Sequence, residues 1–172
     1  MISWQTLIKR WRLRGELFFQ TTEAQRKQRS QRRIVMDYPH QELTREIIAA
    51  AITVHQELRT GLDEKFYERA LCIEFAERGI HFDQQIQYPV NYKKRFLGNL
   101  IPDLVVENSI IVDTKTVDAF TPAHEAQMLG YLSITKLDVA LLLNFKVWPM
   151  GKKRIIRPGY LPSNGSPPNL TL

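Results

Sequence analysis

The amino-acid sequence predicts an α/β sandwich in which a central mixed β-sheet is flanked by helices. Apolar residues recur at helical spacing in three segments, and β-branched runs fill much of the chain between and after them. The predicted order is two helices, three strands, one helix and two strands. With 172 residues, of which 44% are hydrophobic and 24% charged, the chain is long enough to bury its own core. This composition excludes the fibrous, collagenous and membrane classes.

The first helix is predicted in LTREIIAAAITVHQEL, which starts at Leu43, with Thr44 available as its cap. Gly61 then interrupts the helical pattern, and we expect it to serve a turn with positive φ. The residues expected to face the core are Leu43, Ile47, Ile48, Ala51, Ile52, His55 and Leu58.

The second helix follows in DEKFYERALCIEFAERG, with Asp63 near its start and Gly79 as its stop signal. We expect Cys72 to pack within this helix. As the only cysteine of the chain it excludes an internal disulfide, which favours a reducing cytoplasmic location. The residues expected to face inward are Phe66, Tyr67, Ala70, Leu71, Ile73 and Phe75.

A meander of three strands is predicted next, in HFDQQIQYPVNY, in Leu97 to Val106 and in Ile110 to Val117. The third helix is expected in TPAHEAQMLGYLSIT, because Thr121 is a capping residue and Pro122 suits the first helical position.

Two more strands are predicted after the third helix. DVALLLNF is a continuous apolar run, which is typical of a strand buried on both faces, and KKRIIR is expected at a sheet edge.

The charge of the chain is concentrated at its N-terminal end. Residues 1–40 hold nine Lys/Arg and three Asp/Glu, whereas residues 41–172 hold fifteen of each, so the first part accounts for the whole net charge of +6. We interpret residues 1–36 as a basic extension, residues 37–157 as the folded domain and residues 158–172 as a disordered Pro/Gly/Ser/Asn tail. The extension is a phosphate-binding arm, a solvated tail or sequence upstream of the true start at Met36, and the last two readings are favoured.

Polar residues interrupt the otherwise apolar strand pair IPDLVVENSIIVDTKTV. Because side chains alternate along a strand, Asp113 and Lys115 share one face. If the two strands pair around the turn at residues 107–109, Asp103 lies opposite Asp113, at roughly 5 Å. Two such carboxylates repel unless a cation lies between them, and Mg²⁺ prefers this kind of ligand. Lys115 is then placed to orient or deprotonate a water, or to neutralise charge that develops on a phosphate.

These residues resemble the motif of the PD-(D/E)XK nuclease superfamily, in Pro102 and Asp103 followed by Asp113, Thr114 and Lys115. The resemblance implies a restriction-endonuclease-like fold and a nuclease that uses Mg²⁺ or Mn²⁺ on nucleic acid, with DNA favoured over RNA. Its implied metal ligands are Asp103, Asp113, the Thr114 carbonyl and Glu64.

Two further motifs extend the resemblance. Gln127 and Tyr131 match the Q-x-x-x-Y pattern of exonuclease-like members, which implies a role for both beside the catalytic strand. Gly61, Glu64 and Tyr67 match the motif of the bacterial GxxExxY family, and the similarity runs from about Leu43 to Arg157.

Simpler roles stay open for several of these residues. Asp103 and Asp113 could be solvent-facing strand residues, although strands disfavour Asp. Glu64 could serve only to complement the helix dipole, and Tyr67 is expected in the core or behind the site. His55 is expected to be a core histidine, and the role of His124 is open.

The alternative function is a catalytically inactive binding or interaction module with the same fold. The neutral balance of residues 41–172 favours it slightly, because proteins that bind duplex DNA usually present a basic face. Two local clusters of cations argue the other way, at residues 93–95 and 152–154.

Overall fold

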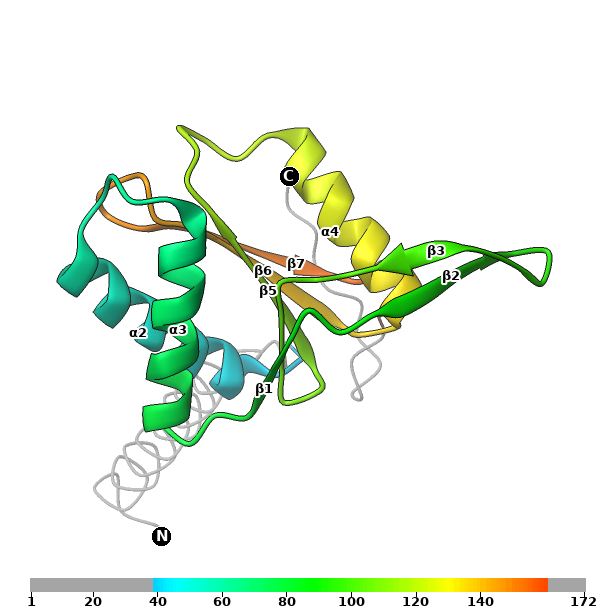
Figure 1. Ribbon diagram of the computed structural model, residues 1–172, viewed down its shortest axis with the longest axis horizontal. Coiled ribbons are helices and arrows are strands. Elements are labelled where there is room, and N and C mark those ends of the chain that lie inside the picture. Colours follow the sequence, from blue (N-terminus) through cyan, green and yellow to red (C-terminus); the bar gives the residue numbers. More distant parts are fainter. Residues whose placement is uncertain (1–38, 161–172) are drawn as a thin grey trace, which may run out of the picture. The chain divides into compact units, whose positions relative to one another are not determined.

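The computed structural model describes residues 39–160 (Figure 1). The predicted N-terminal extension, and the predicted tail from residue 161 onward, lie outside the described residues. The elements in chain order are α2 (Gln41–Leu58), α3 (Glu64–Glu77), β1 (Phe82–Gln84), β2 (Tyr88–Tyr92), β3 (Arg95–Leu100), β4 (Leu104–Val106), β5 (Ile110–Lys115), α4 (Pro122–Thr135), β6 (Val139–Asn144) and β7 (Gly151–Ile156).

Five strands form the central sheet in the order β1-β4-β5-β6-β7. β5 and β6 pair in parallel and are connected through α4, whereas the other neighbouring pairs are antiparallel. The sheet is therefore mixed, as the sequence predicts, because a parallel pair needs a crossover that a helix supplies. β7 lies at an edge of this sheet, which confirms that prediction too.

The predicted three-strand meander is wrong in detail. β2 and β3 pair with each other in a separate two-stranded sheet, which extends away from the central one in Figure 1. Gln85, with φ 52°, ends the first run early, and the chain between Leu100 and Leu104 leaves the strand conformation. The hydrophobic pattern continues across both breaks, so the pattern alone does not reveal them.

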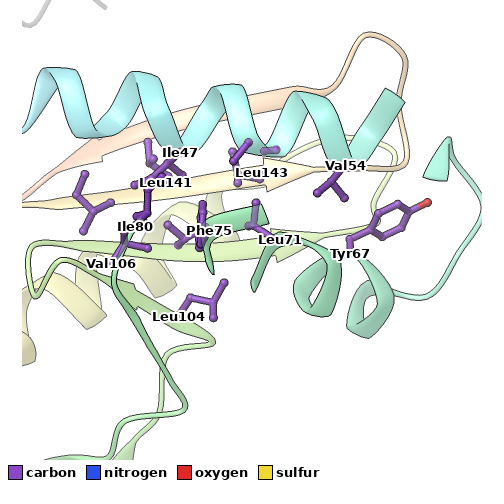
Figure 2. Packing of buried hydrophobic residues seen from close by; sticks show 14 of the residues in the cluster. Ile47, Val54, Tyr67, Leu71, Phe75, Ile80, Leu104, Val106, Leu141 and Leu143 are labelled. Atoms are coloured by element: carbon purple, nitrogen blue, oxygen red, sulfur yellow. The ribbon is translucent and has the colours of Figure 1, made fainter. Parts of the chain in front are cut away.

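Helices cover both faces of the central sheet. Side chains of α2 and α3 pack with those of β4, β5 and β6 in the larger core cluster, part of which Figure 2 shows. A smaller cluster packs Met128 and Leu132 of α4 against Ile111, Ala140 and Leu142. All six residues of β6 are buried because both faces of this strand are covered, which confirms the prediction from its unbroken apolar run.

The inward face of α3 is narrower than predicted. Tyr67, Leu71 and Phe75 are fully buried, whereas Phe66 is 43% exposed and Ile73 is 61% exposed. Residues four apart lie on one side of a helix, so this single stripe meets the sheet and α2, and its neighbours remain near solvent.

The helix starts were predicted with mixed success. α2 begins at Gln41, and Thr44 is buried within it instead of capping it. Thr121 caps α4 as expected, and His124 completes a capping box by accepting a hydrogen bond from the Thr121 N–H at Nδ1. None of the described helices is long and apolar enough to cross a membrane.

Candidate active site

Asp113 lies in β5, and Asp103 directly precedes β4. Leu104, at the end of the β4–β5 ladder, pairs with Val112, so Asp103 lies just beyond this last pair, close enough for its charge to act on Asp113. The backbone N–H of Thr114 donates a hydrogen bond to the Asp103 carboxylate. The turn that sets this register has positive φ at Glu107 and Asn108, as tight hairpin turns require. The strand pairing expected from the sequence is confirmed.

The Lys115 ammonium lies among the oxygen atoms that the sequence assigned to a metal. Its Nζ is 2.5 Å from Asp113 Oδ2 and 3.7 Å from Glu64 Oε1. Nζ also donates a hydrogen bond of 3.3 Å to the carbonyl oxygen of Thr114. The side chain of Lys115 is only 14% exposed. In this structure the ammonium supplies the positive charge that the neighbouring carboxylates need.

Burial dominates the electrostatics of these groups. It raises the pKa of Asp113 to about 6, against the lowering effect of Lys115, and the charges of Asp103 and Glu64 raise it further. Burial raises the pKa of Asp103 too, although Lys115 and the Thr114 N–H oppose that shift. Burial lowers the pKa of Lys115, but its carboxylate neighbours outweigh this effect and the net shift is upward. The site therefore holds more negative charge than one ammonium can balance.

The three residues of the GxxExxY motif form one local unit. Gly61 has φ +107° in the turn between α2 and α3, which favours glycine. The buried Tyr67 hydroxyl donates to the Arg59 carbonyl at 2.8 Å and accepts from the Leu62 N–H at 3.2 Å. Glu64 begins α3 between this turn and Tyr67. Tyr67 thus anchors the turn that positions Glu64 near Lys115.

Glu68 is a further carboxylate that sequence reasoning missed. Burial, followed by the charge of Asp103, raises its pKa, and Glu64 adds to the shift. Its Oε1 accepts a hydrogen bond of 3.3 Å from Gln84. The signal in the sequence is its spacing, since residues four apart share a helix face and Glu68 follows Glu64 by one turn. An open hollow of about 270 Å³ lies beside it, lined by Lys65, Glu68, Arg69, Gln84 and Gln85.

Asn144 is a second residue that the sequence did not single out. Its buried side chain accepts a hydrogen bond from the Val117 N–H at 3.2 Å and donates one to the Val117 carbonyl at 2.6 Å. These bonds hold the chain just after Lys115. A lone Asn at the end of an apolar strand predicts no such partner.

The other predicted site residues have local partners. Gln127 donates a hydrogen bond of 3.1 Å to the Tyr131 hydroxyl on the same face of α4. His55 is buried, with Nε2 3.2 Å from the Phe145 carbonyl, and its ring stacks on Trp148. His55 is therefore a core residue, as expected. The structure brings Glu64, Asp113, Thr114 and Lys115 together beside Asp103, and it leaves Gln127 and Tyr131 paired with each other.

The sequence as a whole matches a known family over most of the described chain. A family model described as the PD-(D/E)XK nuclease superfamily matches residues 41–157. The chain belongs to the PD-(D/E)XK nuclease superfamily. The match includes the five strands of the central sheet, the three described helices and all the site residues named above.

Solved structures similar to this superfamily member have low sequence identity to it. SSO0001 aligns with a TM-score of 0.45 at 16% identity, over 55% of this chain and 50% of its own, so the chain spans about half its length. An alkaline exonuclease from Laribacter hongkongensis aligns with a TM-score of 0.41 at 13% identity, over 63% and 68% of the two chains. A phage-related exonuclease from Haemophilus somnus 129PT aligns with a TM-score of 0.39 at 15% identity, over 64% and 71%. Among curated proteins, none matches the sequence significantly.

PD-(D/E)XK nucleases generally use divalent metal ions. Asp113 Oδ2 is buried and accepts no hydrogen bond of regular geometry from the described residues, although Lys115 lies close to it. The nearby donors are carboxylate and carbonyl oxygens, which hard cations prefer. Within residues 39–160 no group of three or more His, Cys, Asp or Glu side chains is arranged to hold a metal. The oxygen donors that lie together beside Lys115 are the carboxylates of Asp103, Asp113 and Glu64 and the Thr114 carbonyl.

Proposed function

We propose that this PD-(D/E)XK protein is a magnesium-dependent nuclease of the GxxExxY group, with DNA as its preferred substrate over RNA. The observation that carries this proposal is the buried pair of Asp113 and Lys115 beside Asp103, at the end of a central strand. The turn built by Gly61, Glu64 and Tyr67 supports the assignment to the GxxExxY group.

The charge balance of the site supports the need for a metal ion. Asp103, Asp113 and Glu64 surround a single ammonium, and Glu68 lies near Asp103 and Glu64, so an anionic phosphodiester would be repelled once these acids are ionised. Asp103, Asp113 and the Thr114 carbonyl would hold the ion. When bound, Mg²⁺ supplies charge neutralisation and Lewis acidity at the phosphate.

Lys115 has the clearest role among the protein groups. Its ammonium carries the positive charge at the site, and it would stabilise the negative charge that develops on the phosphate oxygens during hydrolysis. Glu64 orients this ammonium from α3, while Asp113 holds it from the same strand. Gln127 and Tyr131 are proposed to contact the substrate from α4.

The proposal is tested by comparing the wild type with Lys115→Ala on single-stranded DNA, duplex DNA and RNA, with Mg²⁺ or Mn²⁺. Loss of one stabilising group of this kind typically lowers the rate by roughly 10² to 10³. Lys146→Ala is the matched control, because Lys146 is an exposed lysine in the loop after β6 and pairs with Asp118. Both variants are compared at equal folded fraction, since Lys115→Ala leaves Asp113 without its ammonium.

Three outcomes are informative. A large loss in Lys115→Ala and none in Lys146→Ala supports the nuclease. Undiminished cleavage by Lys115→Ala places the activity at another site or in a contaminant. If the wild type cleaves no substrate, but calorimetry shows metal binding that Asp103→Asn/Asp113→Asn loses, the inactive binding module becomes the better assignment.

A further inference from the structure

The hairpin formed by β2 and β3 (Tyr88–Leu100) is not part of the central sheet. Its strands pair with each other, and its tip lies well away from the central sheet in Figure 1. Two-stranded hairpins are marginally stable alone in water. An element of this kind that extends from the core is a candidate for contact with a partner.

The hairpin is strongly positive. The segment from Gln84 to Pro102 contains Lys93, Lys94 and Arg95 and no Asp or Glu. Within the described residues none of these three cations forms an ion pair with a carboxylate. By contrast, Lys153 of the other cationic cluster pairs with Glu125 at 2.5 Å.

The turn itself is made of lysines. Lys93 and Lys94 have φ of 46° and 65°, a conformation in which Asn and Gly are preferred at hairpin turns. Lysine at both positions costs backbone energy that Asn-Gly would avoid. The residues at this tip are better explained by the charge they present than by the turn they form.

Apolar and aromatic side chains are exposed beside these cations. Tyr92 is 61% exposed, Phe96 is 63% exposed and Leu97 is 66% exposed. Tyr92 pairs directly with Arg95 across the hairpin, and Lys93 Nζ lies 5.4 Å from the centroid of the Tyr92 ring. Exposed rings next to unpaired cations match the chemistry of a nucleic-acid strand, since bases stack on rings and phosphates pair with Lys and Arg.

We propose that the β2–β3 hairpin is an arm that binds single-stranded nucleic acid. Lys93, Lys94 and Arg95 contact phosphates, while the rings of Tyr92 and Phe96, which lie on opposite faces of the hairpin, each offer a stacking surface to an unpaired base. A single strand fits better than a duplex because base faces are hidden within a stacked duplex. Binding by the arm stands by itself; delivery of the strand to the carboxylate site rests on the proposed nuclease function.

The arm is connected directly to the site. β3 ends at Leu100, and Asp103 follows after Ile101 and Pro102. The chain from Lys94 to Asp103 spans at most roughly 30 Å when extended. At the roughly 3.4 Å rise of stacked nucleotides this length corresponds to about nine nucleotides. A strand longer than this can occupy the arm and the site together.

Fluorescence anisotropy with labelled oligonucleotides in EDTA tests the arm without any cleavage. The probes are single-stranded DNA of about 4 and about 20 nucleotides, below and above the estimated span, and a duplex of the longer length. Lys93→Ala/Lys94→Ala/Arg95→Ala removes the charges, and Tyr92→Ala/Phe96→Ala removes the rings.

Matched controls separate the arm from general effects. Arg45→Ala/Lys136→Ala/Lys146→Ala removes the same charge from exposed positions elsewhere in the chain. Ile73→Ala removes an apolar side chain from α3 that is 61% exposed, as Tyr92 is. Melting temperatures verify that every variant is folded, and Lys→Arg replacements at Lys93 and Lys94 should restore binding.

The expected result is a loss of affinity for the long single strand that the controls do not show. The ring variant should bind roughly 10-fold to 100-fold more weakly, with a smaller effect on the duplex. The charge variant should reduce the slope of log K against log salt concentration by about 2. Each of the three lost phosphate contacts contributes roughly 0.7 to this slope for a single strand. The short probe should be affected less.

The proposal is overturned if the wild type does not bind the long strand, or if both hairpin variants bind as the wild type does. A hairpin variant that changes only the oligomeric state would instead assign the surface to a second copy of the chain. If the arm binds nucleic acid in EDTA but the protein cleaves no substrate, this inference stands and the proposed nuclease function fails. If the hairpin variants cleave every probe as the wild type does, the proposed nuclease function stands and this inference fails.

Discussion

Replacing Asp113 by Asn tests the electrostatics on which the site depends. Asp113 is 2% exposed, and burial raises the pKa of its carboxyl from 3.8 to about 6. The folded protein therefore holds a proton on Asp113 over a pH range in which the unfolded chain has released it. Asn has nearly the same shape and cannot ionise, so Asp113→Asn removes this pH dependence, together with the ion pair to Lys115.

The magnitude follows from the two pKa values. At about 1.4 kcal/mol per pH unit, the difference between 3.8 and about 6 corresponds to about 3 kcal/mol in the free energy of unfolding. Because the pKa of Asp113 is raised in the folded protein, its carboxyl contributes this stability in full at pH values below its pKa in the unfolded chain. This stability is lost as the pH rises through the folded value, and about 2 kcal/mol of the loss falls between about pH 4 and about pH 7.

Urea unfolding in EDTA, repeated from about pH 4 to about pH 7, measures this dependence without added salt or metal. The stability of Asp113→Asn relative to the wild type should rise by about 2 kcal/mol over that range. Asp118→Asn is the matched control, because the Asp118 side chain is 91% exposed. Its pH dependence should run parallel to that of the wild type.

Parallel curves for Asp113→Asn and the wild type would refute the reasoning, because they would mean that Asp113 titrates alike in the folded and unfolded chains. If the stability of Asp113→Asn relative to the wild type falls as the pH rises, the pKa of Asp113 is lowered by folding, and Lys115 outweighs burial.

Two predictions concern the turn before α3. Glu64→Gln should lower the pKa of Asp113, because the Glu64 charge raises it; the pH midpoint of the Asp113-dependent stability change should move down, and an unchanged midpoint would contradict the coupling. Tyr67→Phe should destabilise the fold by about 1 to 2 kcal/mol in urea unfolding, because it removes the hydrogen bonds to Arg59 and Leu62. Tyr160→Phe, outside the regular elements, serves as its control, and equal stability of the two variants would exclude an anchoring role.

Much of the site could be predicted because it depends on local geometry. Alternation along β5 and the length of the turn at residues 107–109 together bring Asp103 close to Asp113, just beyond the pair of Leu104 and Val112. The same is true of the Thr121 cap and of the buried run in β6. The role of Glu68 was missed because nothing local shows that its helix face lies close to Asp103.

The separate hairpin was missed for a related reason. A β-rich pattern indicates that a segment forms strands, but it does not identify their partners. Positive φ at Gln85 and the break between Leu100 and Leu104 divide the apparent meander. Gln85 has no typical turn sequence, whereas Pro102 was an available signal for the second break, because proline cannot donate a hydrogen bond to a strand ladder. The tertiary structure therefore shows that the exposed cations and rings lie on an arm, whereas the sequence shows them only as a cluster.

The sequence by itself determined the three described helices, the strands β5, β6 and β7, the proximity of Asp103 to Asp113 and the lysine two positions beyond Asp113. These features follow from backbone periodicity, which repeats within one segment. The tertiary structure decided that Glu64 meets Lys115, that the ammonium lies among the predicted metal ligands, and that Phe66 and Ile73 remain near solvent. Such contacts depend on how helices pack across the sheet and on how far each side chain reaches, and no periodicity within a single segment contains that information.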